Sequence, residues 1–195
     1  MEDEINHSEH SDPNKKILDS FFSDLSEEQT QPHMIEASEL SRLFERGITP
    51  EDVCREFVQR GFLLHGTGKL IASRLEPRQA RDESGHPDNI KNAVYASDDP
   101  RVPLFMALVS GIPGRSRYSI TVETLDDQTE VESVIFEATF DIPKDRVSYV
   151  YVLPKDTFEA AGMGQFTSDV PVDTRYILPI TRTDFPYEIT KIEDN

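Results

Sequence analysis

The period of the hydrophobic pattern changes near residue 61. Before it, apolar residues recur every three or four positions, which predicts one helix over 36–46 and another between Thr49 and Gly61. Thr49, followed by Pro50 and two acidic residues, is a favourable helix start. After residue 61, apolar residues alternate with polar ones or form short continuous runs, and both patterns are typical of strands.

Four later segments carry the strongest strand patterns. Residues 118–122 and 134–140 alternate on either side of a polar stretch, which predicts an antiparallel hairpin. Residues 147–153 are nearly all apolar and rich in β-branched side chains, so we expect a buried central strand. Residues 175–180 predict another strand, in which Pro179 indicates an edge or a bulge. Helices first and strands afterwards indicate an α+β fold.

The first 34 residues differ from the rest in composition. They hold nine acidic residues and two lysines, and their apolar residues gather in 17–25. We therefore expect an acidic, mostly disordered tail over 1–34 and one domain over 35–195. Ile17, Phe21 and Leu25 share one face of a short amphipathic helix. That helix either docks on the domain, which we favour, or binds a partner.

Charge and cysteine content exclude several kinds of site. The 195 residues have a formal net charge of −17, which argues against binding nucleic acid or an anionic membrane by bulk electrostatics. No apolar run has the length of a membrane span, and we expect a cytoplasmic location, with export as an effector left open. The single cysteine, Cys54, excludes an intrachain disulfide and a cysteine-rich zinc site, and we expect no metal. It lies on the apolar face of its helix, which indicates a core residue.

Two segments carry the candidate chemistry. The run 62–68 leads His65 into a Gly/Thr turn, and the run 92–100 leads Tyr95 into an Asp-Asp-Pro turn. A strand that ends with a polar or aromatic side chain beside glycine is a common way to build a small-molecule site, because glycine lets a ligand approach the backbone.

This ordered pair resembles the start of the ADP-ribosyltransferase fold. The matching residues are His65-Gly66-Thr67, then Val94-Tyr95-Ala96-Ser97, then an apolar, helix-like run over 103–108. The resemblance covers about residues 62–190. It implies a split antiparallel β-sandwich, preceded here by two N-terminal helices over 35–61, with NAD as the substrate.

The resemblance also implies roles for these residues. His65 would hydrogen-bond a ribose hydroxyl, the backbone of Gly66 beside Thr67 would clamp the carboxamide, and Tyr95 would stack on nicotinamide. Each residue also has an ordinary structural explanation, His65 as a strand-end histidine and Tyr95 as a sheet aromatic. RNA 2′-phosphotransferases share the fold, but they resemble this chain less because Tyr95 stands where they carry a histidine.

The third position of the family's site departs from the pattern. Many members carry a glutamate there, and the residue we align with it is Gln165. An amide brings no negative charge toward the cation that develops as nicotinamide leaves. Glu159 and Asp169 are the nearest acidic residues if the alignment is shifted. The catalytic set is thus His65, Tyr95 and Gln165.

Two functions follow as hypotheses. The first is an ADP-ribosyltransferase-like domain that transfers ADP-ribose to an unidentified acceptor or hydrolyses NAD. The alternative is a catalytically inactive interaction protein on the same scaffold, which contacts its partner through the acidic N-terminal tail.

Overall fold

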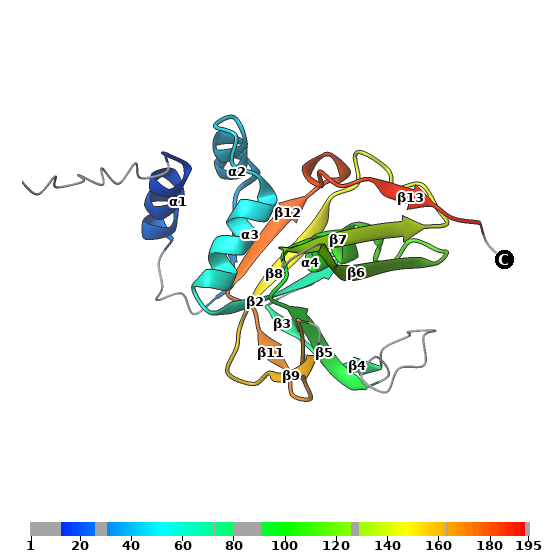
Figure 1. The fold of residues 1–195 in the computed structure, drawn as a ribbon. Coiled ribbons are helices and arrows are strands. Elements are labelled where there is room, and N and C mark those ends of the chain that lie inside the picture. Colours follow the sequence, from blue (N-terminus) through cyan, green and yellow to red (C-terminus); the bar gives the residue numbers. More distant parts are fainter. Residues whose placement is uncertain are drawn as a thin grey trace, which may run out of the picture.

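The computed structural model describes residues 13–25, 31–71, 73–79, 91–125, 129–162 and 164–193. Helices and β-sheets both contribute to the fold, which confirms the mixed α+β class (Figure 1). Among the described residues no helix is both long enough and apolar enough to cross a membrane.

Four α-helices are described, and each overlaps a segment with a predicted helix or a helix-like pattern; two of them occupy the predicted helices over 36–46 and between Thr49 and Gly61. These are α2 (Ala37–Phe44) and α3 (Pro50–Gln59). The start of α3 is fixed by a reciprocal cap, in which the Asp52 amide donates to Oγ1 of Thr49 and the Thr49 amide donates to the Asp52 carboxylate. The helix α4 (Arg101–Val109) is buried along nearly its whole length, as its continuous apolar run requires.

A large mixed sheet forms the centre of the fold. The strands of this sheet follow the order β1-β12-β8-β2-β5-β10-β9, and β4 pairs with the first two residues of β5. The bounds are β1 (His33–Met34), β2 (Phe62–Thr67), β4 (Arg78–Gln79), β5 (Asn92–Ser97), β8 (Ser148–Pro154), β9 (Glu159–Gly162), β10 (Gln165–Ser168) and β12 (Tyr176–Ile180). The predicted central strand is confirmed as β8. Pro179 lies past the end of β1, where β12 has a described neighbour only on its β8 side.

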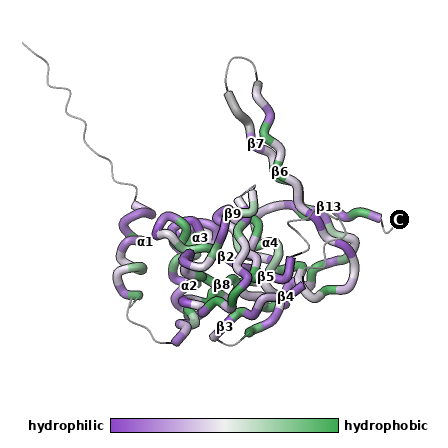
Figure 2. The backbone as a smooth tube through the Cα atoms, turned by 90° about the horizontal axis from the view of Figure 1, so that it is seen from below, coloured by the Kyte–Doolittle hydropathy of each residue, from purple (hydrophilic) through white to green (hydrophobic). Residues whose placement is uncertain are grey.

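Two smaller sheets complete the fold. The strands β3 (Arg74–Leu75) and β11 (Val172–Asp173) form one of them. The other contains β13 (Ile189–Lys191), β7 (Thr129–Ala138) and β6 (Ser116–Leu125) in that order, so the predicted antiparallel hairpin is confirmed. Figure 2 shows the distal part of this hairpin projecting away from the body of the molecule.

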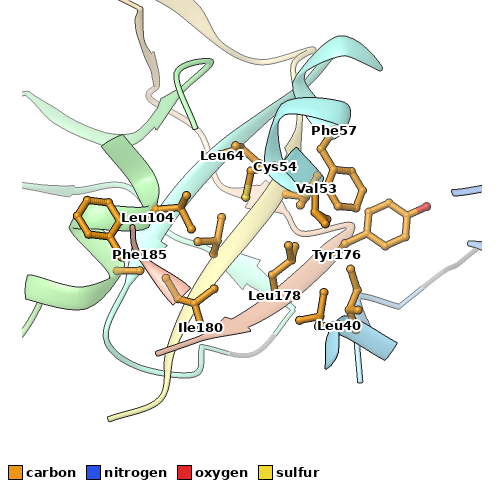
Figure 3. Close-up of a cluster of buried hydrophobic side chains, with 14 of the residues drawn as sticks. Leu40, Val53, Cys54, Phe57, Leu64, Leu104, Tyr176, Leu178, Ile180 and Phe185 are labelled. Atoms are coloured by element: carbon orange, nitrogen blue, oxygen red, sulfur yellow. The ribbon is translucent and has the colours of Figure 1, made fainter. Parts of the chain in front are cut away.

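Hydrophobic residues pack on both faces of the large sheet. One cluster joins α2, α3 and α4 to the sheet residues Leu64 and Leu178, with Cys54 and Phe57 fully buried among them (Figure 3). Burial raises the pKa of the Cys54 thiol, as expected of a core residue. The second cluster lies on the opposite face and includes Leu63, Tyr151 and Leu153. The large sheet is therefore covered on both sides.

Part of the predicted disordered tail belongs to the folded domain. The helix α1 (Pro13–Asp24) buries Phe22 against the ring of Phe57, with centroids 4.6 Å apart. The strand β1 pairs in parallel with β12. The folded part thus begins before residue 35, and α1 takes the docked position that we favoured. Residues 1–12 and 26–30 of the predicted tail lie outside the described residues.

Candidate functional site

The three candidate catalytic residues lie on neighbouring strands of the large sheet. His65 belongs to β2, Tyr95 to β5 and Gln165 to β10, and these strands are adjacent in that order. Across the β5–β10 pair, Gln165 lies opposite Ser97 and Thr167 lies opposite Tyr95. The topology therefore joins motifs that are far apart in the sequence.

The pairing of β2 with β5 is very short. All six residues of β2 pair with β8, whereas toward β5 the described pairing consists of Leu64 opposite Ser97. Continued antiparallel pairing would place Gly66 opposite Tyr95, but β2 and β5 do not pair there. The motifs His65-Gly66-Thr67 and Val94-Tyr95-Ala96 thus lie on either side of the stretch in which the neighbouring strands β2 and β5 do not pair.

His65 bridges that stretch with its ring. Its Nδ1 lies 2.7 Å from the backbone oxygen of Tyr95, and since a carbonyl only accepts, Nδ1 carries the proton. Burial lowers the pKa of His65, the bond to Tyr95 opposes that shift, and the positive charge of Arg78 adds to it. The imidazole is therefore neutral near pH 7, and its Nε2 is the nitrogen that can accept a hydrogen bond.

Tyr95 uses its hydroxyl to hold the backbone. That oxygen accepts from the Lys91 amide at 3.0 Å and donates to the Lys91 carbonyl at 3.2 Å. Tyr151 does the same at Ile71, accepting at 2.5 Å and donating at 2.9 Å. The two tyrosines thus fix Ile71 and Lys91, and this role gives Tyr95 a structural function besides any contact with a ligand.

The strand register separates the candidate side chains by face. Leu64 and Ser97 are directly opposite and share a face, so Tyr95 lies on that face and His65 on the other. Gln165 is opposite Ser97 and therefore shares the face of Tyr95. Hence the sheet brings Tyr95 and Gln165 together on one face, while His65 reaches Tyr95 through the backbone.

Gln165 contacts the projecting hairpin. Its Nε2 donates to the hydroxyl of Tyr118 on β6 at 2.5 Å. The sequence gives no sign of this contact, because the two residues are 47 positions apart. Tyr118 is accordingly a candidate site residue that sequence reasoning missed.

An acidic residue lies in the same row as Tyr95. Glu159 on β9 is opposite Thr167, which is itself opposite Tyr95. Residues directly opposite each other point to the same face, so the exposed Glu159 shares the face of Tyr95 and Gln165. Asp169 comes after the end of β10 and is exposed. Of the two alternative acids, Glu159 is the one that the sheet aligns with the candidate site.

Gly66 has a clear packing role. A Cβ built on it would lie 1.9 Å from the backbone oxygen of Pro103 and 2.6 Å from the amide nitrogen of Ala107. The helix α4 therefore rests directly on this position, and only glycine allows that approach. Thr67 is buried beside it. The predicted Gly/Thr turn after His65 is wrong, because Gly66 and Thr67 belong to β2 and pair with β8, and their packing accounts for these residue types without a ligand.

A network of polar side chains lies where β5 leads into α4. Ser97 Oγ donates to the Gly164 carbonyl at 2.9 Å and accepts from the Asp99 amide at 3.0 Å. Arg101 binds Asp99 through two nitrogens, at 2.9 and 2.6 Å, and also contacts Glu132 on β7. The hydrogen bonds to Asp99, followed by those to Glu132, raise the pKa of Arg101. The network ties β5, β10 and the hairpin together.

The described residues hold no group of three His, Cys, Asp or Glu side chains that could bind a metal ion. A cavity of about 560 Å³ is lined by residues of β7, β13 and the segments 140–144 and 182–185, and none of the three candidate catalytic residues lines it.

Comparison with known proteins gives no relative. No protein-family model, curated protein or solved structure matches the chain. The function must therefore be argued from the geometry itself.

Proposed function

We propose that this chain binds NAD where β2 and β5 stop pairing, and that it is an ADP-ribosyltransferase-like domain that transfers ADP-ribose to an unidentified acceptor or hydrolyses NAD. The observation that carries the proposal is that the two sequence motifs lie next to each other where β2 and β5 do not pair. His65-Gly66-Thr67 and Val94-Tyr95-Ala96 flank the same unpaired stretch, and β10 brings Gln165 beside them. The large sheet and the separate three-stranded sheet also suit the split sandwich that the resemblance implies.

Each residue has a chemistry that suits this substrate. A neutral His65 can accept a hydrogen bond from a ribose hydroxyl through Nε2, because Nδ1 is held by Tyr95. The Tyr95 ring offers a flat apolar surface for nicotinamide. The Gln165 amide, oriented by Tyr118, can hydrogen-bond the nicotinamide ribose.

Cleavage of the nicotinamide bond requires stabilisation of positive charge on the ribose. Gln165 carries none of the negative charge that this demands, and we propose that Glu159, in the same row as Tyr95, supplies it. The expected activity is weak, because Glu159 is two strands away from Tyr95, about 10 Å at ordinary strand spacing.

One observation favours the alternative, an inactive interaction protein. His65 and Tyr95 lie on opposite faces of the sheet, and both have structural hydrogen bonds. In this alternative the motifs only hold the scaffold, and the acidic N-terminal tail contacts a partner.

Nicotinamide release from NAD distinguishes the two functions. The proposal predicts slow release by the wild type, and loss of release in His65→Ala and Tyr95→Ala. Met106→Ala, at an exposed position of α4, serves as the control and should release nicotinamide at the wild-type rate. Absence of release by the wild type, together with retained NAD binding, would leave a binding domain without catalysis.

A further inference from the structure

The cavity beside β13 lies outside the proposed NAD site and has the size of a ligand site. Its volume of about 560 Å³ falls within the range of about 300–1,000 Å³ that is usual for small-molecule pockets. The strands β7 and β13 pair side by side (Figure 1), and they contribute Ala138, Ile189 and Lys191 to the lining. The segments 140–144 and 182–185 supply the other lining residues.

The apolar lining residues lie deeper than most of the charged ones. The apolar set consists of Ala138, Phe140, Ile142, Phe185 and Ile189. Two of its members, Ala138 and Phe185, are buried, and the other three are half-buried. Asp141, Lys144 and Lys191 are exposed and therefore surround the mouth. A ligand that fits this lining has an apolar body and a charged group at one end.

Positive charge predominates along the lining, although the chain as a whole has a net charge of −17. Three cationic side chains line the cavity together with a single carboxylate, that of Asp141, and the cations are Lys144, Arg182 and Lys191. Asp184 follows close after Arg182 in the sequence, but its carboxylate accepts from the Thr181 amide and hydroxyl, at 2.7 and 2.8 Å. The charge of the lining thus favours an anion.

Two of the three cations have no carboxylate partner in the described part of the chain. Lys144 forms no ion pair there. The Arg182 guanidinium donates to two carbonyls, from Nη1 to Phe185 at 2.8 Å and from Nη2 to Tyr187 at 3.2 Å. Its central carbon lies 5.8 Å from the centre of the Phe185 ring. A guanidinium has five N–H donors, so Arg182 is fixed beside an aromatic ring and still has donors for an anion.

The third cation, Lys191, is held by Asp141. Its Nζ lies 3.1 and 3.0 Å from the two carboxylate oxygens. The two side chains are 64% and 88% exposed, and ion pairs at such exposure contribute little stability. An anion that enters the cavity can therefore compete with Asp141 for Lys191.

We infer that this cavity binds a small aromatic anion, whose charged group is a carboxylate or a phosphate ester. The charged group contacts Arg182 and Lys144 and competes with Asp141 for Lys191. The aromatic body packs against the ring of Phe185. This inference does not rest on the proposed NAD site, because none of the residues assigned to that site lines the cavity.

Titration of the full chain with anilinonaphthalene sulfonate tests this inference. This probe is an aromatic anion whose fluorescence rises in apolar surroundings, and we expect saturable binding. Competition then compares naphthyl phosphate, naphthoate and the neutral naphthol as displacing ligands. The two anions should displace the probe at concentrations about tenfold lower than naphthol, since hydrogen bonds between charged groups add to the affinity. The stronger of the two anions identifies the preferred charged group.

Charge variants at the mouth show whether the probe occupies this cavity. Lys144→Met should weaken probe binding by about threefold, and Asp141→Asn should strengthen it by about threefold, because the amide releases Lys191. Lys16→Met is the matched control, since Lys16 is exposed on α1, at the opposite end of the molecule from β13 (Figure 1). Its affinity should equal that of the wild type. Thermal unfolding followed by circular dichroism shows that each variant is folded.

Three results would overturn the inference. The first is an absence of saturable probe binding by the wild type. The second is displacement by naphthol at the same concentration as by the two anions. The third is an equal affinity of Lys144→Met, Asp141→Asn and the wild type for the probe.

Discussion

The α-carbon of Gly66 lies against the backbone of α4, and this contact decides what the position tolerates. Gly66→Ala would place a Cβ 1.9 Å from the Pro103 carbonyl oxygen, so α4 would have to move. We expect a loss of about 1–3 kcal/mol in the free energy of unfolding, measured by urea denaturation. Ser116→Ala, at an exposed position, is the control. Equal stability of Gly66→Ala and the wild type would contradict the packing role.

His65 gives the fold a dependence on pH. Its pKa in the folded state is lowered from 6.5 by burial, so the unfolded chain binds this proton more readily. Its contribution to stability is complete above the unfolded pKa and is lost as the pH falls toward the folded value. We expect the unfolding free energy of the wild type to fall from about pH 7 to pH 5 more steeply than that of His65→Gln. Parallel pH profiles for the two proteins would refute the assignment.

Adding a negative charge at Gln165 and removing the negative charge of Glu159 should change the rate of nicotinamide release in opposite directions. Gln165→Glu keeps a hydrogen bond to Tyr118, with the hydroxyl as donor, and adds a carboxylate beside Tyr95. Nicotinamide release should rise by about tenfold or more, as one well-placed charge contributes roughly 2–4 kcal/mol in a transition state.

Glu159→Gln should lower the same rate, and Gln165→Ala separates the effect of charge from that of the amide. If release at saturating NAD is the same in all of these variants, neither residue contacts the reacting ribose.

At the scale of elements, the local pattern of apolar and polar residues was sufficient to predict a strand where the segment is long enough to show a period. The β6–β7 hairpin and the central β8 follow from alternation and from a continuous apolar run. Within the tail that composition predicts to be mostly disordered, the spacing of Ile17 and Phe21 predicts the helix that the structure shows as α1, whereas its contacts with Phe57 and Arg60 of α3 depend on the fold. Strands of two to four residues, such as β3 and β9, are too short to show a period.

The docking of α1 makes a testable contribution to stability. Phe22 packs edge-on against Phe57, and the Arg60 guanidinium lies 4.5 Å from the centre of its ring. Phe22→Ala should lower the free energy of unfolding by about 3 kcal/mol in a denaturant titration. Lys16→Ala, exposed on the same helix, should change it little. An unchanged midpoint for Phe22→Ala would mean that α1 does not stabilise the domain.

At the scale of the whole molecule, the motifs around His65 and Tyr95 could be identified from the sequence, but their position on neighbouring strands follows only from the fold. The order of His65 and Tyr95 along the chain suggested one site, but only the topology shows that their strands are neighbours with little pairing between them. The role of Tyr118, the alignment of Glu159 with Tyr95 and the separation of His65 by face all depend on register. A one-residue slip would reverse each of them, so sequence alone could not predict them.

Calorimetric titration of the full chain with NAD tests the central proposal most directly. We predict binding by the wild type, retained binding by Tyr95→Phe, which keeps the ring and loses the bonds to Lys91, and loss of binding in Tyr95→Ala. Thermal unfolding of the two variants shows whether each is folded. Absence of binding heat for the wild type at millimolar NAD would contradict the account.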